Sequence, residues 1–419
     1  MMEDQFSRKE EEFMSDEQAM EQPESRDILA TTDSYVTKLV KQTILDAVEK
    51  RASDIFIEPL EDILRVRFRI DGLLCETGKY PLEHSSAIIS CIKVLSGLDI
   101  AEHRFPQDGR FKMKMDMKSV DFRVSVLPGS LGEKVVLRVL DKSGIRLQFD
   151  ALGFDEESIA IIRRNLKKPY GMILICGPTG SGKTTSLYTC LKFIDAIDVN
   201  IVTVEDPIEF QLEGINQVAV QEQVGLSFSA ALRSILRQDP DIIMIGEIRD
   251  LETADIAVKS SLTGHLVLST LHTTTATGAV VRFINMGIEP FLVASSCLLT
   301  ASQALLRILC SHCKQEVPVT DRLLNEFKKF NITVPSHFRY YKPVGCRFCN
   351  NIGFLGRLGL IEVLELDSEI RDLLVRKETE ITIREAAIAK GMKTLREKAL
   401  HKVIEGLTTV EEIYRVTTQ

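Results

Sequence analysis

One eight-residue stretch constrains this chain more than any other, because residues 177–184 have the sequence GPTGSGKT. It satisfies the spacing G-x-x-x-x-G-K-[ST] and directly follows a continuous apolar run, residues 171–176, that is typical of a buried strand. The residues after it carry apolar side chains at helical spacing, at positions 187, 190, 191 and 194. A strand, a glycine-rich turn and a helix in this order predict a phosphate-binding loop.

Each residue type in this loop has a physical reason. Glycines let backbone amides point at phosphate oxygens, and the helix that follows adds its positive dipole end. Lys183 is expected to reach the β- and γ-phosphates of a nucleoside triphosphate, and Thr184 to ligate Mg²⁺. The predicted nucleotide-binding set is Gly177, Pro178, Thr179, Gly180, Ser181, Gly182, Lys183, Thr184 and Thr185. The alternative is a strand-to-helix turn that binds no ligand.

The chain of 419 residues is too long for one compact core, so we expect several domains. Short apolar strands alternate with helical segments at 201–204, 241–245 and 266–270, which predicts a RecA-like α/β domain with a parallel sheet. The expected order is an acidic disordered leader (1–33), an N-terminal α+β domain of PAS-like type (34–145), a linker (146–153), the RecA-like ATPase domain (154–308), a tetracysteine insert (309–351) and a C-terminal helical region (352–419).

The distribution of charge limits the classes of partner. Residues 1–33 hold 11 acidic and 3 basic side chains, which accounts for the whole formal charge of −8, and the rest of the chain is balanced. A balanced body argues against direct nucleic-acid binding, which usually needs a basic excess. The longest apolar run, residues 290–306, is interrupted by polar residues and is interpreted as a buried helix rather than a membrane span. With no secretory signal, a cytoplasmic location is predicted.

Four of the nine cysteines form two C-x-x-C pairs, Cys310 with Cys313 and Cys346 with Cys349. Two such pairs in a cytosolic protein predict a closed, tetrahedral structural Zn²⁺ site. The 32-residue gap between the pairs is longer than that of the commonest zinc ribbons. A redox-active dithiol is the main alternative, although it would require only one pair.

Acidic residues and histidines follow the predicted strands of the nucleotide domain. Glu205, Asp206 and Glu209 come after the strand at 201–204, and Glu247 comes after the strand at 241–245. Ligands of parallel sheets bind at such strand ends, so these carboxylates are candidates to hold Mg²⁺ and to polarise the attacking water. Solvated turn residues are the alternative.

Two histidines flank the next strand of the same domain. His265 precedes the strand at 266–270 and His272 follows it. We interpret this pair as sensors of the γ-phosphate or of a neighbouring subunit.

Several segments together resemble one family. IVTVEDPIEF, LRSILRQDPDIIMIGEIRD and SLTGHLVLSTLHTTTATGAVVRF are similar to the Asp box, Walker B segment and His box of the ATPases of type II secretion and type IV pilus assembly. ASDIFIEP, LRVRFRIDG, PQDGRF and the four-cysteine insert extend the resemblance over about residues 34–419. It implies a cytoplasmic homo-hexamer that hydrolyses ATP with Mg²⁺ and acts on a platform protein at the inner face of the cytoplasmic membrane.

The resemblance also implies roles for individual residues. Glu205, Asp206 and Glu209 would be the Asp-box acids, Glu247 the Walker B carboxylate, and His265 and His272 the His-box pair. Arg110 and Arg123, in PQDGR and DFRVS, match arginines that complete the nucleotide site from the N-terminal domain. A guanidinium there would offset the charge that develops on the transferred phosphoryl group.

The sequence departs from the family at three positions that concern packing: Phe56 stands in place of histidine, Ala304 in place of arginine and Ile308 in place of a basic residue. A longer N-terminal docking domain is not recognised. Related motors of pilus retraction or DNA uptake share the catalytic motifs, and a nucleotide-binding scaffold without turnover is a further alternative. The cysteine insert favours an assembly or secretion motor.

Overall fold

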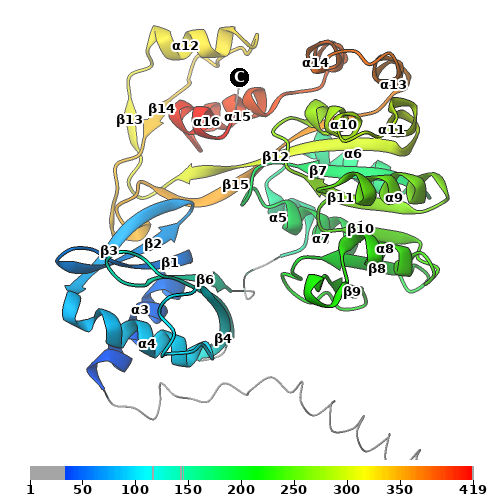
Figure 1. Ribbon diagram of the computed structural model, residues 1–419. Helices are drawn as coiled ribbons and strands as arrows, with labels where there is room; N and C mark the ends of the chain where they lie inside the picture. Colours follow the sequence, from blue (N-terminus) through cyan, green and yellow to red (C-terminus); the bar gives the residue numbers. More distant parts are fainter. Residues whose placement is uncertain (1–33, 116–117, 142–143, 145, 418–419) are drawn as a thin grey trace, which may run out of the picture. The chain divides into compact units, whose positions relative to one another are not determined.

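The computed structural model describes residues 34–115, 118–141, 144 and 146–417, and the chain divides into two compact units between residues 145 and 146 (Figure 1). The leader predicted at 1–33 lies outside the described residues. None of the described helices combines the length and the apolarity needed to cross a bilayer.

The first unit is a six-stranded antiparallel sheet with two helices on one face. The sheet order is β3-β2-β1-β6-β5-β4. The strands are β1 (Ala52–Pro59), β2 (Ile63–Ile70), β3 (Leu73–Pro81), β4 (Gln107–Met115), β5 (Lys118–Leu127) and β6 (Lys134–Leu140), and the helices are α3 (Tyr35–Glu49) and α4 (Ser85–Leu95). Alternate residues of β2 are buried, so one face contacts the helices and the other is more open. The predicted α+β architecture is confirmed.

The second unit is built on a seven-stranded sheet in the order β15-β12-β7-β11-β10-β8-β9. Its strands are β7 (Gly171–Cys176), β8 (Ile201–Glu205), β9 (Asn216–Ala219), β10 (Ile242–Ile245), β11 (Leu266–Leu271), β12 (Cys297–Leu309) and β15 (Phe354–Glu365). All neighbours pair in parallel except β12 and β15. All residues of β7, β10 and β11 are buried, as expected for a sheet covered on both faces.

Helices cover both faces of this sheet. One core joins it to α8 (Phe228–Ile235), α9 (Leu251–Leu262), α10 (Ala276–Asn285), α11 (Pro290–Ser296), α13 (Ser368–Val375) and α14 (Glu380–Ala389). The opposite core contains α5 (Phe149–Leu152), α6 (Glu156–Leu166) and α7 (Lys183–Ile194). The predicted RecA-like α/β class is confirmed. The predicted linker at 146–153 was wrong in part, since it contains α5 and buries Phe149 in this core.

The buried helix expected at 290–306 is also wrong. The segment begins as the short helix α11 and continues as the long strand β12, which pairs with β7 on one side and β15 on the other. A strand buried on both faces has no alternating pattern, so periodicity cannot distinguish it from a buried helix.

The region at 352–419, expected to be helical, begins instead with β15. This strand pairs antiparallel with β12 from Leu299 to Leu309. Its partner strand lies far away in sequence, so local pattern did not reveal it. The remaining elements are β13 (Gln315–Val317), α12 (Asp321–Lys328) and β14 (Tyr340–Lys342) between the two strands, and α15 (Leu395–Ile404) and α16 (Val410–Val416) at the end. Helices α12, α15 and α16 share one core.

Candidate functional site

The predicted phosphate loop leaves the carboxyl end of β7 and closes at the start of α7. Gly177 and Gly182 both have positive φ, +147° and +87°. A Cβ on Gly177 would lie 2.4 Å from the backbone oxygen of Gln303, and one on Gly182 would lie 2.9 Å from the side-chain nitrogen of the same residue. A side chain at position 177 would displace the backbone of β12 and one at position 182 the Gln303 amide, and the positive φ favours glycine at both.

Lys183 and Ser181 place polar atoms inside this loop. The Lys183 side chain donates from Nζ to the backbone oxygens of Gly177 at 2.8 Å and Pro178 at 3.1 Å. Burial lowers the pKa of its ammonium. The buried hydroxyl of Ser181 has no hydrogen-bond partner among the described residues. The Ser181 hydroxyl and the Lys183 ammonium, which points into the loop, are donors that fit phosphate oxygens.

The other loop residues lie around these atoms. Pro178, Thr179 and Gly180 are exposed at the tip, and Thr184 and Thr185 are half-buried on the first turn of α7. A hydroxyl at the start of this helix suits Mg²⁺, which prefers oxygen ligands.

Three further strands bring polar residues to the same edge of the sheet. Because β8, β10, β11 and β7 are parallel, their carboxyl ends meet beside the phosphate loop. Glu205 ends β8, Glu247 lies two residues after β10, and His272 follows β11 directly. The turn at Gly246 is fixed to the neighbouring strands, since its N–H donates to Val204 and its oxygen accepts from the Thr270 hydroxyl.

Glu247 contacts two side chains at this edge. One of its oxygens accepts from Arg249, and the other lies 3.0 Å from Nε2 of His272. Partial burial pushes the pKa of Glu247 upward, but the hydrogen bonds from Arg249 and His272 outweigh it and the pKa lies below its usual value. The carboxyl is therefore ionised at neutral pH and is oriented by two side chains, which lie in the segments that follow β10 and β11.

Glu205 has a different environment. It is 3% exposed, and its carboxylate accepts hydrogen bonds from the hydroxyl of Tyr188, from Thr203 at 2.6 Å and from Gln217 at 3.0 Å. These contacts join α7 to β8 and β9 below the loop. A carboxylate that is buried with three donors is a structural anchor in this arrangement rather than an open base.

The other Asp-box acids lie nearer to solvent. Asp206 is exposed and Glu209 is half-buried, and both follow β8. The charge of Asp206 is close enough to Arg249 to raise the pKa of that guanidinium, after the larger effect of its hydrogen bond to Glu247.

His265 does not join this group. It precedes β11, and the seven residue steps from His265 to His272 span roughly 23 Å at about 3.3 Å per step. Its ring lies 3.0 Å from the backbone oxygen of Ser260, at the end of α9. A strand places its two ends at opposite edges of the sheet, so the two histidines do not face one γ-phosphate within a chain, and a role for His265 at a neighbouring subunit stays a prediction.

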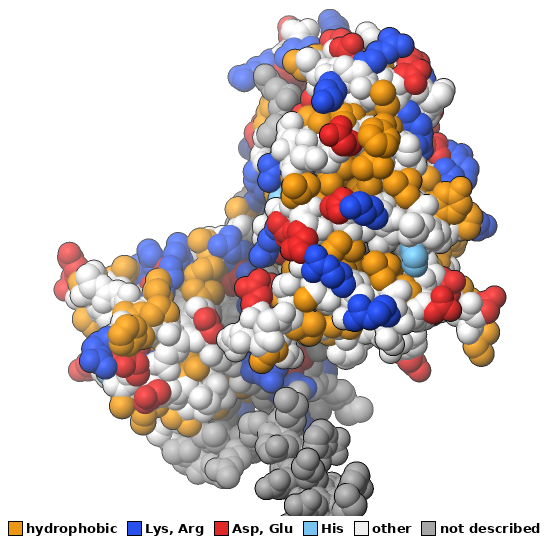
Figure 2. Space-filling model, turned by 45° about the vertical axis from the view of Figure 1, so that its right-hand side comes forward, with side chains coloured by type: hydrophobic (Ala, Val, Ile, Leu, Met, Phe, Trp, Pro, Cys, Tyr) orange, Lys and Arg blue, Asp and Glu red, His pale blue; other side chains and the backbone are white. Residues whose placement is uncertain are grey.

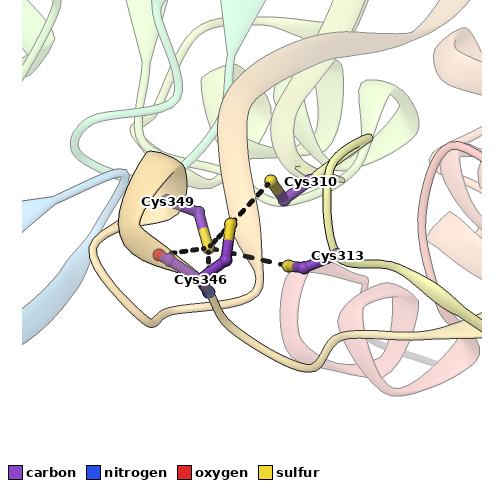
Figure 3. A group of neighbouring side chains, drawn as sticks. All are labelled: Cys310, Cys313, Cys346 and Cys349. Atoms are coloured by element: carbon purple, nitrogen blue, oxygen red, sulfur yellow. Dashed lines mark hydrogen bonds between the residues drawn. The ribbon is translucent and has the colours of Figure 1, made fainter.

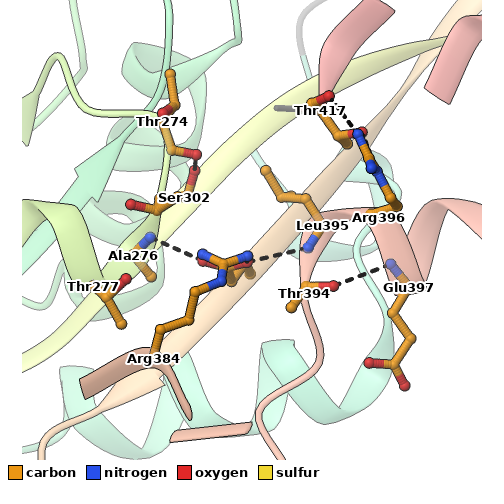
Figure 4. Close-up of polar contacts among 12 residues, drawn as sticks. Thr274, Ala276, Thr277, Ser302, Arg384, Thr394, Leu395, Arg396, Glu397 and Thr417 are labelled. Atoms are coloured by element: carbon orange, nitrogen blue, oxygen red, sulfur yellow. Dashed lines mark hydrogen bonds and ion pairs between the residues drawn. The ribbon is translucent and has the colours of Figure 1, made fainter. Parts of the chain in front are cut away.

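The segment after His272 is fastened to elements from the C-terminal part of the unit (Figure 4). The Ser302 hydroxyl donates to the Thr274 oxygen at 2.8 Å, and the Ala276 N–H donates to Glu362 at 3.0 Å. Glu362, on β15, is 1% exposed and also accepts from the Leu395 N–H and pairs with Arg384. His272 is thus linked by a short chain of contacts to α14 and α15.

The four knuckle cysteines form one compact cluster (Figure 3). Their sulfur atoms all lie within 4.8 Å of one another, and three pairs are separated by 3.8 to 3.9 Å. A tetrahedron with Zn–S bonds of ~2.3 Å separates its sulfurs by about 3.8 Å, so the geometry fits zinc. The backbone N–H groups of Gly345, Cys346 and Gly353 donate to cluster sulfurs, which favours thiolates.

The cluster lies where β12 ends and β15 begins. Cys310 follows β12 directly, Cys349 belongs to a short 3₁₀ turn (Arg347–Cys349), and Leu309 pairs with Phe354 just beyond it. The cluster therefore holds together the two chain segments that connect the sheet to the insert, which contains β13, α12 and β14.

Arg110 and Arg123 belong to the first unit. They are directly paired on β4 and β5, and Arg123 is paired with Arg138 on β6. Cross-strand partners lie on the same face of a sheet, so three arginines form a row. Asp54 on β1 continues this row and compensates Arg138, with 3.3 Å between its carboxylate oxygen and Nε of the arginine.

These features can be compared with known proteins. The sequence matches the family described as type II/IV secretion system protein over residues 30–415. The chain belongs to this family. The resemblance inferred from the motifs is confirmed.

The type II/IV secretion system family includes close relatives of this chain. The type IV pilus assembly ATPase PilB of Myxococcus xanthus is 50% identical over 389 residues, which are 92% of this chain and 68% of the relative. The type II secretion system protein E of Aeromonas hydrophila is 46% identical over 402 residues, 96% of this chain and 79% of the relative. The solved pilus retraction motor PilT with bound ADP covers 91% of this chain and 97% of its own, with a TM-score of 0.61 at 24% identity, which shows a shared fold.

The three positions that are expected to depart from the family pattern are buried or half-buried. Ala304 is buried in the core with α12, α15 and α16, and Ile308 is half-buried on the same strand. The ring of Phe56 is faced by Arg69, 5.2 Å from its centroid. Sequence analysis did not foresee Gln303 at the loop, because its partners are 117 and 122 residues away.

Proposed function

We propose that this chain is a Mg²⁺-dependent ATPase that forms a homo-hexamer and powers type II protein secretion or type IV pilus assembly. Its family includes relatives that are named ATPases, among them PilB of Myxococcus xanthus at 50% identity. The observation that carries the proposal is that the phosphate loop, Glu247 and His272 meet at one edge of one parallel sheet.

The loop residues 177–185 would bind the triphosphate. Its backbone amides and the start of α7 would hold the phosphates, Lys183 would release its two backbone oxygens and contact the β- and γ-phosphates, and Thr184 would ligate the metal. Mg²⁺ supplies neutralisation of the charge on the transferred group. Asp206 and Glu209, which follow β8, would orient water around the metal.

Glu247 would activate the attacking water. Its carboxylate is ionised and is aimed by Arg249 and His272, which is the arrangement that a general base or a water-orienting group requires. His272 would then respond to the γ-phosphate through Glu247. We assign Glu205 a positioning role, because its oxygens already accept from Tyr188 and two other donors.

Two other residue groups act around this site in the proposal. Arg110 and Arg123 would complete the site of a neighbouring subunit, because a row of guanidiniums is suited to an anion. Cys310, Cys313, Cys346 and Cys349 would hold a structural Zn²⁺.

The proposed partner is a platform protein in the inner membrane, which the chain would act on from the cytoplasmic side. Membrane association would then be peripheral and would depend on that partner. Direct nucleic-acid binding is not part of the proposal, since basic and acidic side chains are interspersed on the face shown in Figure 2, without a continuous basic stripe.

The test is ATP hydrolysis by the full chain with Mg²⁺ or with a chelator, beside the variant Glu247→Gln. We expect Mg²⁺-dependent turnover that falls by about 100-fold or more in Glu247→Gln while ATP still binds. The control is Glu252→Gln, an exposed glutamate on α9 that contacts Arg233, which should leave turnover unchanged. Wild-type protein that binds ATP but never hydrolyses it, with its oligomeric state recorded, would instead support a regulatory scaffold.

A further inference from the structure

Gln303 is a buried amide in the middle of a mostly apolar strand. It lies on β12 between Ser302 and Ala304 and is 2% exposed. A buried amide destabilises the fold unless both its ends are hydrogen-bonded. Its partners should therefore reveal why it is there.

Both ends of this amide contact the phosphate loop and its helix. Nε2 donates to the backbone oxygen of Ser181 at 2.8 Å, and Oε1 accepts from the hydroxyl of Ser186 at 2.8 Å. Ser181 belongs to the loop and Ser186 to the first turns of α7. One side chain thus brackets the residues between them, which include Lys183.

The backbone of the same residue also meets the loop. The parallel pairing of β12 with β7 ends at Ser302 and Cys176, so Gln303 stands beside Gly177, where the loop leaves the sheet. A Cβ on Gly177 would clash with the Gln303 oxygen at 2.4 Å. The loop is therefore supported along one side by β12.

We propose that Gln303 is a positioning residue for nucleotide binding, which holds the phosphate loop in its binding shape through Ser181 and Ser186. The proposal rests on the proposed ATPase function and deepens it. By fixing the Ser181 backbone, Gln303 also fixes the buried Ser181 hydroxyl, which has no partner among the described residues and is available to a phosphate oxygen. Without the Gln303 amide, nucleotide binding itself would have to order the loop, and the free energy used for this would lower the affinity for nucleotide.

The test compares ADP and ATP affinity of the full-length chain and of Gln303→Leu, by titration with a fluorescent nucleotide at a temperature where both are folded. Leucine has a similar size and makes neither hydrogen bond, so we expect about tenfold weaker binding of both nucleotides. KM for ATP should rise by a similar factor while kcat changes less than about twofold, because the loop contacts ground state and transition state alike. Ser186→Ala, which removes one of the two bonds, should weaken binding by a smaller factor.

The matched control is Thr300→Val, three residues earlier on β12. Thr300 is also fully buried and donates to the Ala276 oxygen at 2.8 Å, away from the loop. It should lower the melting temperature and leave nucleotide affinity unchanged.

A double variant distinguishes positioning from general loss of stability. If Gln303 acts through Ser186, the double variant Gln303→Leu/Ser186→Ala should bind nucleotide no more weakly than Gln303→Leu alone. Unchanged affinity in Gln303→Leu, with a wild-type chain that hydrolyses ATP, would overturn the positioning role and leave the ATPase intact. A wild-type chain that binds neither nucleotide would overturn both.

Discussion

Three polar residues on β12 and β15 are buried more completely than their charge or polarity would suggest. Gln303, Arg307 and Glu362 are 2%, 8% and 1% exposed. Each is satisfied by groups from a different part of the chain: the phosphate loop, α16, and the starts of α10 and α15. Because unsatisfied buried groups are costly, these residues fix which elements may pack on the two strands.

The Arg307 pair gives a prediction about acid stability. Glu412 on α16 is buried, and it accepts from Nε of Arg307 at 2.9 Å and from Arg415. Burial pushes the pKa of Glu412 upward, but the hydrogen bonds from Arg415 and Arg307 outweigh it and the pKa falls below its usual 4.5. Replacing Glu412 by Gln leaves Arg307 without its counter-charge, so we expect a loss of about 3 kcal/mol in the free energy of unfolding at pH 7.

The pH dependence follows from the direction of the shift. A lowered pKa in the folded state gives stabilisation that is complete above the unfolded pKa, near 4.5, and is lost as pH falls through the lower folded value. We therefore expect the free energy of unfolding, measured with denaturant, to differ between wild type and Glu412→Gln by a constant amount from pH 7 to pH 5. Below pH 5 this difference should become smaller. Glu411→Gln, an exposed neighbour on α16 that contacts Tyr340, should show little loss at any pH. If the difference in the free energy of unfolding between wild type and Glu412→Gln instead grew as the pH fell, the stabilising ion pair would be contradicted.

At the scale of elements, the cysteine cluster stabilises the junction between the insert and the sheet and has no separate hydrophobic core. It joins the ends of β12 and β15, and the insert beyond it buries Leu323 and Phe327 against α15 and α16. Metal binding and local folding are therefore coupled. We expect one Zn²⁺ per chain, and removal of it should raise hydrogen exchange in 310–353 and in α16, while β4 and β5 stay protected.

The metal prediction is checked by elemental analysis and hydrogen exchange on wild type, Cys346→Ser and Cys75→Ser. Cys75 is a half-buried thiol on β3, outside the cluster, and its replacement should keep the zinc. A chain that purifies without metal and forms one disulfide reversibly would favour the redox alternative instead.

How far the sequence predicts an element depends on where its partners lie. The phosphate loop was predicted because its glycines, Lys183 and flanking strand are contiguous, and β7 has the bounds that the apolar run gave it. Strand β12 was mistaken for a helix because burial on both faces removes the period-two signal. The pairing of β15 and the hydrogen bonds of Gln303 depend on contacts between distant segments, which no local pattern contains. The parallel pairing of β11 with β7 places His265 at the sheet edge opposite the phosphate loop, and the sequence alone does not give this pairing.

At the scale of the whole molecule, the two units carry complementary halves of the proposed chemistry. The second unit holds the phosphate loop and Glu247, and the first holds the row of Arg110, Arg123 and Arg138. Arg138 already pairs with Asp54 on β1, with 3.3 Å between its Nε and a carboxylate oxygen, and guanidiniums also suit phosphate anions. In the proposed ring, Arg110 and Arg123 would bind the nucleotide of the neighbouring subunit.

This assignment predicts complementation between two inactive chains. Lys183→Ala should lose nucleotide binding, and Arg110→Ala/Arg123→Ala should lose turnover, each when purified alone. If the arginines act on the neighbour, a mixed ring contains some sites with an intact loop from one chain and intact arginines from the other. Random mixing at equal amounts should then restore about one quarter of wild-type ATPase activity, because each half of a site is intact with a chance of about one half.

The control for this mixing experiment is Lys112→Ala, an exposed residue two positions from Arg110 on the same face of β4, which pairs with Asp121 at 3.7 Å. It should be active alone, and mixing it with Lys183→Ala should only dilute activity. Sedimentation must show that mixed chains share one assembly, since separate rings cannot complement. If shared rings stay inactive, Arg110 and Arg123 serve their own chain or only the sheet, because complementation requires that the two halves of a site come from different subunits.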